Sequence, residues 1–299
     1  MGSVATRIRQ VLGILWVVDG LLQCQPAMFS PLFWHQVLQP VVVGQPPVVL
    51  FLLREGIHLW REGGIWANGL AAFLQLGIGG LLLMKRPGWY RWGLWLSLGW
   101  ALVVWIFGEG FGGLLLPSAS LLTGAPGSAL LYVVWSAILL FAPDTVESAA
   151  IALMRGYWGL GLFLGQVAGR HMGPALIQMA QSPQPAWVSR PEYLLGHWLT
   201  VYPGWGREVM TGLWGVLAVL WTTFPRHWST WALTGWVLAT MWWTGMDFGV
   251  LGGTGTDPNT PPLVAMALAV VIGSTMPGVR RQPRGFTPFP AMRRIVGHD

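Results

Sequence analysis

Eight apolar runs divide this sequence, each about 15–20 residues long, and a helix of about 20 apolar residues spans the hydrocarbon core of a bilayer. Polar connectors or connectors rich in Gly and Pro separate them. The runs cover residues 8–24, 65–84, 90–107, 127–141, 151–167, 209–224, 228–244 and 262–276. We therefore predict an all-α, polytopic membrane protein with about eight transmembrane helices.

The composition supports lipid as the main solvent. Only 9% of the residues are charged and 54% are hydrophobic, whereas about a quarter of the residues of a soluble domain are charged. The 21 Trp residues suit the interfaces of a bilayer, where an apolar ring with a polar N–H is stable. The basic residues flank the apolar runs instead of interleaving with aromatic residues, which argues against nucleic acid as a partner. The single cysteine, Cys24, excludes a disulfide or a dithiol relay within this chain.

The distribution of Lys and Arg predicts the topology, because these residues concentrate in cytoplasmic loops. With the N-terminus inside, twelve lie on the cytoplasmic side and five on the other. The twelve are Arg7, Arg9, Lys85, Arg86, Arg91, Arg155, Arg226, Arg280, Arg281, Arg284, Arg293 and Arg294, and the five are Arg54, Arg61, Arg170, Arg190 and Arg207. We expect a multi-pass protein of the cell membrane with both termini cytoplasmic.

An internal repeat, at a shift of about 138 residues, is the most specific signal in the chain. Two aromatic residues, two glycines and a leucine recur with one spacing. The first copy is Trp105-x-x-Gly108-x-x-Phe111-Gly112-x-Leu114, and the second is Trp242-x-x-Gly245-x-x-Phe248-Gly249-x-Leu251. We predict two four-helix membrane repeats, residues 1–146 and 147–278, followed by a basic cytoplasmic tail, residues 279–299.

An even number of spans in each repeat gives both repeats the same orientation, related by an axis along the membrane normal. The two Gly-rich turns then lie together on the non-cytoplasmic side. The long connector on that side contains VVVGQPPVVLFLL within residues 40–60. Pro46 and Pro47 interrupt this stretch, so we interpret it as a re-entrant or interfacial helix.

Three acids are candidate catalytic or proton-relay residues. Asp19 falls late in the first span, where a carboxylate needs a partner or a polar cavity. Glu109 and Asp247 fall at nearly equivalent repeat positions, offset by one residue, where each helix meets its Gly-rich turn. The alternative is that each acid is a solvated or hydrogen-bonded structural group.

The candidate cofactor-binding residues are also partly symmetric. His58 and His197 match in the repeat, and two imidazoles are able to ligate a haem or a metal. No His-x-x-x-His spacing or other metal motif accompanies them, so no metal site is predicted, and interfacial hydrogen bonding is the alternative. Gln75 is able to bind a quinone carbonyl or to tie helices together, and the repeated Trp105 and Trp242 complete the set.

The first repeat resembles the DoxX/DoxD-like superfamily of four-helix membrane proteins. The matching residues are Arg9, Leu12, Gly13, Leu15, Trp16, Asp19, Gly20, Gln75, Gly77, residues 79–84 and Arg86. This superfamily includes quinone-reducing thiosulfate oxidoreductase subunits, so the resemblance implies a four-helix membrane unit and a link to quinone chemistry.

Three functions remain open at this point. The first is a redox subunit with an outward-facing pocket between the repeats that holds a quinone or a haem. The second is a proton-coupled transporter of small solutes, and the third is a non-catalytic assembly or anchoring subunit of a membrane complex. The sequence leaves open whether the protein is an enzyme, and the expected partners are the lipid bilayer and other membrane subunits.

Overall fold

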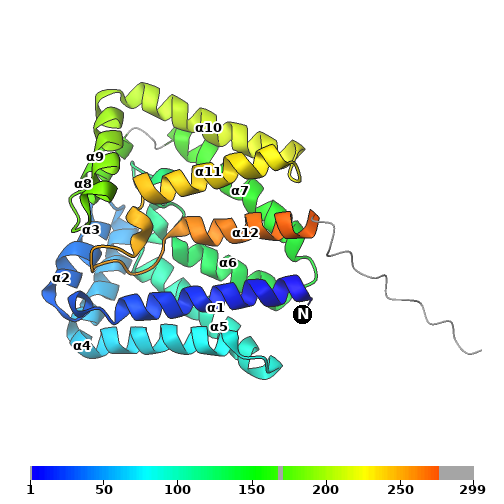
Figure 1. The fold of residues 1–299 in the computed structure, drawn as a ribbon. Helices are drawn as coiled ribbons and strands as arrows, with labels where there is room; N and C mark the ends of the chain where they lie inside the picture. Colours follow the sequence, from blue (N-terminus) through cyan, green and yellow to red (C-terminus); the bar gives the residue numbers. More distant parts are fainter. Residues whose placement is uncertain (1, 168–170, 276–299) are drawn as a thin grey trace, which may run out of the picture.

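The computed structural model describes residues 2–167 and 171–275, which form helices and turns without a strand. The basic tail predicted for residues 279–299 lies outside the described residues. Figure 1 shows the longer helices running side by side, with α1, α12 and α6 near the middle of the bundle.

The helices of the first half begin with α1, Ser3–Gln23, and a series of short turns. The turns are η1 (Pro26–Phe29), α2 (Pro31–Phe33), η2 (Trp34–Leu38, a π-helix) and α3 (Gln39–Val41). The remaining elements are α4 (Pro47–Leu83), α5 (Pro87–Phe107), η3 (Phe111–Gly113), η4 (Leu121–Thr123) and α6 (Ser128–Phe141).

The second half repeats this order with a few substitutions. Its elements are α7 (Val146–Val167), α8 (Met172–Met179), α9 (Ala186–Val201), α10 (Pro203–Thr223), α11 (Trp228–Thr244), η6 (Asp247–Gly249) and α12 (Thr260–Thr275). The long α4 corresponds in position to α9 and α10 together. Within α4, Gly64 has φ 51° and bends the helix, as the break at Tyr202 separates α9 from α10.

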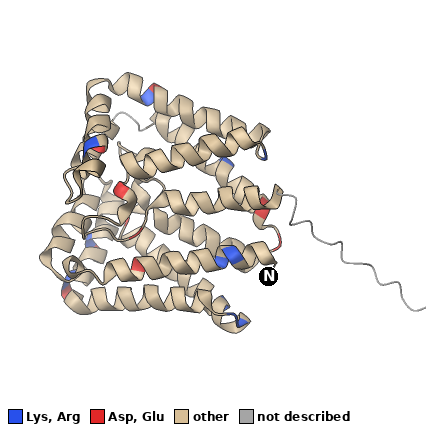
Figure 2. Ribbon diagram, in the orientation of Figure 1, with Lys and Arg blue, Asp and Glu red and all other residues tan. Residues whose placement is uncertain are grey.

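The eight predicted apolar runs fall on α1, the second part of α4, α5, α6, α7, α10, α11 and α12, and none extends more than one residue beyond its helix. Met276, the last residue of the eighth run, lies outside the described residues. Two described helices, α4 and α5, are long and apolar enough by themselves to span a membrane. Of the stretch interpreted as a re-entrant or interfacial helix, Val41 ends α3 and the part from Pro47 onward begins α4. Figure 2 shows that the charged residues gather mostly toward the two ends of the bundle.

Close backbone contact joins α1 to α4 and α7 to α10. A Cβ atom at Gly13 would meet the carbonyl oxygen of Gly79, and one at Gly165 would meet Thr211. Small residues at such contacts let helix backbones approach closely, which increases the van der Waals contact between the helices.

An arginine in each half caps the C-terminal end of the neighbouring helix. Arg9 of α1 donates to the carbonyl oxygens of Leu82 and Met84, the latter at 2.6 Å. Arg155 of α7 donates to Trp221 O at 3.1 Å and Thr222 O at 3.4 Å. Because the last carbonyls of a helix lack intrahelical partners, both arginines stabilise the same end of the bundle.

The two halves meet through α6, α7, α12 and α1. Trp135 of α6 is fully buried and donates its indole N–H to Leu263 O of α12 at 2.9 Å. Trp158 of α7 stacks on Trp214 of α10 with ring centroids 5.6 Å apart. Large buried rings therefore fill the interior of the bundle.

Candidate functional site

Each half has a sharp turn after α5 or α11, and we call these the first corner (residues 108–114) and the second corner (residues 245–251). The first corner contains four consecutive residues of positive φ and the second contains three. In the first, Gly110 and Phe111 have φ of 55° and 61°, and the following Gly112 and Gly113 have φ of 61° and 67°. In the second, Asp247, Phe248 and Gly249 have φ of 53°, 59° and 67°. The recurring Trp-Gly-Phe-Gly pattern thus produces the same left-handed turn twice.

Trp105 and Trp242, the predicted cofactor-binding indoles, each form hydrogen bonds and a ring contact that stabilise one of these corners. Trp105 donates to Pro126 O at 2.9 Å, and Trp242 donates to Pro258 O at 2.9 Å and to Phe248 O at 3.0 Å. Each ring also packs edge-on against the corner phenylalanine, with centroids 5.1 Å apart in the first corner and 5.0 Å apart in the second. Both N–H groups are therefore occupied by structural hydrogen bonds.

Glycine is required within both corners for steric reasons. A Cβ atom at Gly112 would collide with the carbonyl oxygen of Pro126, and one at Gly249 with that of Asp257. The loop before α6 and the loop before α12 are therefore pressed against the turns, which brings their side chains next to the corner acids.

The corner acids occupy different positions in the two halves. Glu109 precedes the left-handed residues, and its Oε1 accepts hydrogen bonds from Ser128 Oγ at 2.8 Å and Ala129 N–H at 3.1 Å, at the start of α6. In the second half Met246 takes this place, and its sulphur accepts from Thr260 Oγ1 at 3.5 Å at the start of α12. Asp247 instead matches Gly110.

Asp19 is buried beside the first corner. It is 2% exposed, and its Oδ2 accepts a hydrogen bond of 2.5 Å from the Tyr132 hydroxyl of α6. Its other oxygen, Oδ1, is buried without a hydrogen-bond partner. The predicted need of this acid for a partner is therefore met on one oxygen only.

Asp257 is a third acid in this region that we had not predicted as a site residue. It accepts hydrogen bonds from Asn259 N–H at 2.7 Å and Thr256 Oγ1 at 3.2 Å. The Ser128 hydroxyl, which donates to Glu109, also lies within hydrogen-bonding reach of Asp257. Its sequence signal was present in Thr256-Asp257-Pro258, the second-half counterpart of the residues before α6.

We define Asp19, Glu109 and Asp257 as the acid cluster. Burial and, to a smaller extent, the charge of Asp257 raise the pKa of Glu109 from 4.5 to about 7, although the hydrogen bonds from Ser128 and Ala129 partly oppose this rise. Burial also raises the pKa of Asp257. The negative charges of Asp257 and Glu109 both repel the charge of an ionised Asp19. Like charges this close resist simultaneous ionisation.

Asp247 does not join this cluster. It lies within hydrogen-bonding reach of Glu192 of α9 and Gln184, and Gln184 Nε2 donates to Glu192 Oε2 at 3.3 Å. Glu192 is fully buried. The three predicted acids are therefore divided between two places, with Asp19 and Glu109 in one and Asp247 in the other.

The predicted histidine pair lies on the outside of the bundle. The His58 side chain is 65% exposed, with Nδ1 3.8 Å from Glu62 Oε1 on the next turn of α4. His197 is exposed on α9 and stacks on Tyr193, with ring centroids 6.2 Å apart. Gln75 is buried on α4, and its Oε1 has no hydrogen-bond partner. Within residues 2–167 and 171–275, no three His, Cys, Asp or Glu side chains are placed to hold a metal ion.

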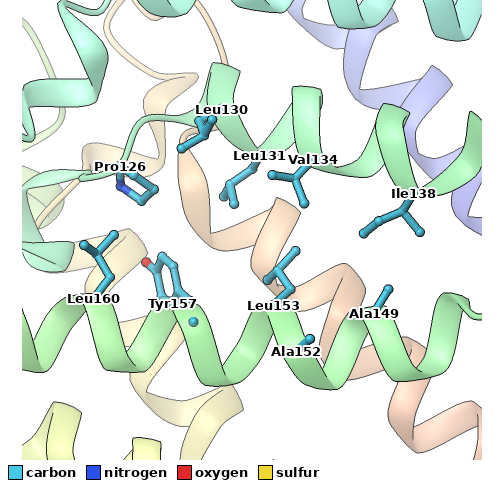
Figure 3. A pocket seen from close by; sticks show the side chains of 11 residues that line it. Pro126, Leu130, Leu131, Val134, Ile138, Ala149, Ala152, Leu153, Tyr157 and Leu160 are labelled. Atoms are coloured by element: carbon cyan, nitrogen blue, oxygen red, sulfur yellow. The ribbon is translucent and has the colours of Figure 1, made fainter. Parts of the chain in front are cut away.

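An apolar groove of about 420 Å³ lies between α6 and α7, where the first half meets the second. Figure 3 shows Pro126, Tyr157 and Leu160 at one end of it, and Ile138 and Ala149 at the other. Tyr157 is 4% exposed and its hydroxyl has no hydrogen-bond partner. The neighbouring Thr260 hydroxyl donates instead to Met246 Sδ.

No family model, curated protein or solved structure matches this chain.

Proposed function

We propose that this chain is a multi-pass membrane protein in which α1, the second part of α4, α5, α6, α7, α10, α11 and α12 cross the bilayer. The exposed side chains of the bundle support this proposal. Trp66 is 81% exposed, Phe73 72% and Trp236 64%, and such apolar surface is costly in water but favourable in lipid. The charged residues gathered toward the two ends fit the same placement (Figure 2).

Within this membrane bundle, we propose that the protein couples the movement of a small solute to that of a proton. The acid cluster carries this proposal. Three carboxyl groups gather beside the contact between the halves, at the end of the bundle where α1 ends and α12 begins (Figure 1). Because neighbouring buried carboxylates cannot all be charged at low cost, such a cluster takes up and releases protons with changes in its surroundings.

The experiment uses purified protein in liposomes that enclose a pH-sensitive dye. A panel of amino acids, sugars and carboxylic acids is added outside, one at a time, at equal external and internal pH. We expect luminal acidification with at least one solute, and its loss in Asp19→Asn and Glu109→Gln. Trp66→Phe, an exposed and distant change, is the matched control. Solute-driven acidification that persists in both acid variants would contradict the proposal.

A second candidate, a quinone-associated redox subunit, is favoured by the groove between α6 and α7. Its apolar walls suit an isoprenoid tail, and the unpartnered Tyr157 hydroxyl at one end suits a carbonyl oxygen. A haem is less well supported, since His58 and His197 are exposed. Gentle extraction followed by an absorption spectrum and mass spectrometry of the lipid fraction tests this candidate. Protein that carries no quinone and no chromophore would exclude it.

A further inference from the structure

The fully buried Glu192 of α9 and the partly buried Asp247 of the second corner form an acid pair that the proposed function does not use. Glu192 lies on α9, outside the eight proposed spans, and is fully buried although its helix neighbours Tyr193 and Leu194 are exposed. Glu192 Oε1 and Asp247 Oδ1 are both buried without a hydrogen-bond donor. Each carboxyl group nevertheless lies within hydrogen-bonding reach of the other.

The two halves of the molecule provide an internal comparison for this pair. In the first corner a Cβ atom at Gly110 would touch Leu53 Cδ1 at 3.0 Å and Gln45 Nε2 at 2.8 Å. Gly110, Leu53 and Gln45 therefore correspond to Asp247, Glu192 and Gln184. An apolar contact is sufficient to hold the first corner against α4, so the fold of the corner does not in itself require two acids.

Two adjacent buried carboxylates need a neutralising positive charge. Only two ion pairs occur in the described part of the chain, His58 with Glu62 and Arg226 with Glu147, and neither involves this pair. The other charged groups on the elements packed against α9 are Arg190, Arg207, Glu208, His171, His197 and Asp257, and none of them forms a hydrogen bond or ion pair with Glu192 or Asp247.

We propose that Glu192 and Asp247 hold one proton between them and form a second proton-binding site, separate from the acid cluster, that fastens the second corner to α9. One proton placed between Glu192 Oε1 and Asp247 Oδ1 gives each orphaned oxygen a partner and removes one negative charge. Gln184 then donates to the remaining oxygen of Glu192. Burial and the neighbouring Asp247 raise the pKa of Glu192 to about 10, so the proton is retained at neutral pH.

The first test is an infrared measurement on the protein in lipid nanodiscs at about pH 8.5, where most of the Glu109 carboxyl is ionised. The wild-type spectrum minus that of Glu192→Gln is expected to contain the C=O band of one protonated carboxyl, shifted in D₂O. The same subtraction with Glu208→Gln, an exposed acid of α10, is expected to contain none. A missing band in the Glu192→Gln difference would overturn the proposal.

The second test measures amide hydrogen exchange of residues 245–255, corrected for intrinsic rates. Glu192→Ala leaves Asp247 buried without its partner, so we expect exchange to rise by roughly tenfold, the effect of one lost buried hydrogen bond. The double variant Glu192→Leu with Asp247→Gly copies the apolar contact of the first half and is expected to keep the corner protected. Unchanged amide exchange of residues 245–255 in Glu192→Ala would overturn the proposal that this acid pair fastens the second corner to α9.

A divalent cation is the competing occupant of this site. If Ca²⁺ raises the thermal unfolding midpoint of the wild type but not that of Glu192→Gln, a metal ion and not a proton neutralises the pair, and the proposal fails. No change with Ca²⁺ is the expected result. Because Glu192→Gln leaves Glu109 and Asp19 intact, these outcomes are independent of proton-coupled transport by the acid cluster.

Discussion

The carboxylate of Glu109 and the thioether of Met246 occupy matching positions at the two corners, each accepting a hydrogen bond from the hydroxyl at the start of the following helix. Ser128 donates to Glu109 at 2.8 Å and Thr260 donates to Met246 at 3.5 Å. One scaffold thus carries an acid in one half and an uncharged side chain in the other. The difference between them isolates what the acid adds.

Glu109→Met copies the second half, and its effect on stability is expected to depend on pH. In the wild type the pKa of Glu109 rises from 4.5 to about 7 on folding, so the folded state binds the proton more tightly and stability falls as pH rises between these values. Glu109→Met has no titratable group at this position, so its stability is not expected to fall in this way as pH rises. Thermal unfolding in detergent at about pH 5 and about pH 8 measures it. An equal pH dependence in Glu109→Met and wild type would contradict the assignment.

Tyr132→Phe removes the hydroxyl that donates to Asp19 and leaves a buried carboxyl group without any partner. We expect a loss of about 1–3 kcal/mol in the free energy of unfolding. In a cycle with Asp19→Leu, which removes the acceptor, the two losses are expected to be less than additive, because both variants break the same contact. Chemical denaturation of the four proteins in mixed micelles measures this coupling, and strictly additive losses would show that the contact contributes nothing.

Trp105→Phe and Trp242→Phe each keep an aromatic ring but delete the indole N–H that donates to the loop packed against a corner. Each change is expected to destabilise the protein by about 1 kcal/mol, the typical net value of one hydrogen bond. Trp66→Phe, at a site 81% exposed, is the control and is expected to have little effect. If the control lowers the unfolding midpoint as much as the corner variants do, loss of the indole hydrogen bonds is not the cause of the destabilisation.

The proposed topology is testable by cysteine labelling, because Cys24 is the only native thiol. In a Cys24→Ser background, Ser182→Cys between α8 and α9 is expected to react with an impermeant maleimide added to intact cells. Asp144→Cys, between α6 and α7, is expected to react only after the membrane is opened. Both positions are exposed in the structure. Labelling of both positions in intact cells would rule out a bilayer between them.

Much of the helical structure follows from apolar patterning, and the described residues of all eight predicted runs fall on helices, with at most one residue of a run beyond the helix end. The Gly-rich repeat motif also located both corners, because two glycines and an aromatic residue at fixed spacing mark a turn that other residues resist. Among the helices that the structure describes, only α4 and α5 are individually long and apolar enough to identify as spans. In other helices, for example α11 with Thr230, Thr234 and Trp236, polar and amphipathic residues lower the mean hydropathy.

The candidate site was less predictable because it depends on contacts between loops. Asp19 and Glu109 were predicted and do lie together, but Asp257 was passed over because its partners Ser128 and Glu109 are distant in sequence. The offset of one residue between Glu109 and Asp247 seemed minor, yet one residue at a left-handed turn redirects the side chain. Glu192 was not predicted as a site residue, and only the packing of α9 against the second corner reveals that it is buried.

The most direct test of the acid cluster is an infrared titration of the protein in lipid nanodiscs from about pH 5 to about pH 9. We expect a protonated carboxyl band that disappears with a midpoint near pH 7, is absent in Glu109→Gln and persists in Glu192→Gln. A wild-type spectrum with no band titrating near this midpoint, or an unchanged band in Glu109→Gln, would contradict the claim that the acid cluster binds a proton there.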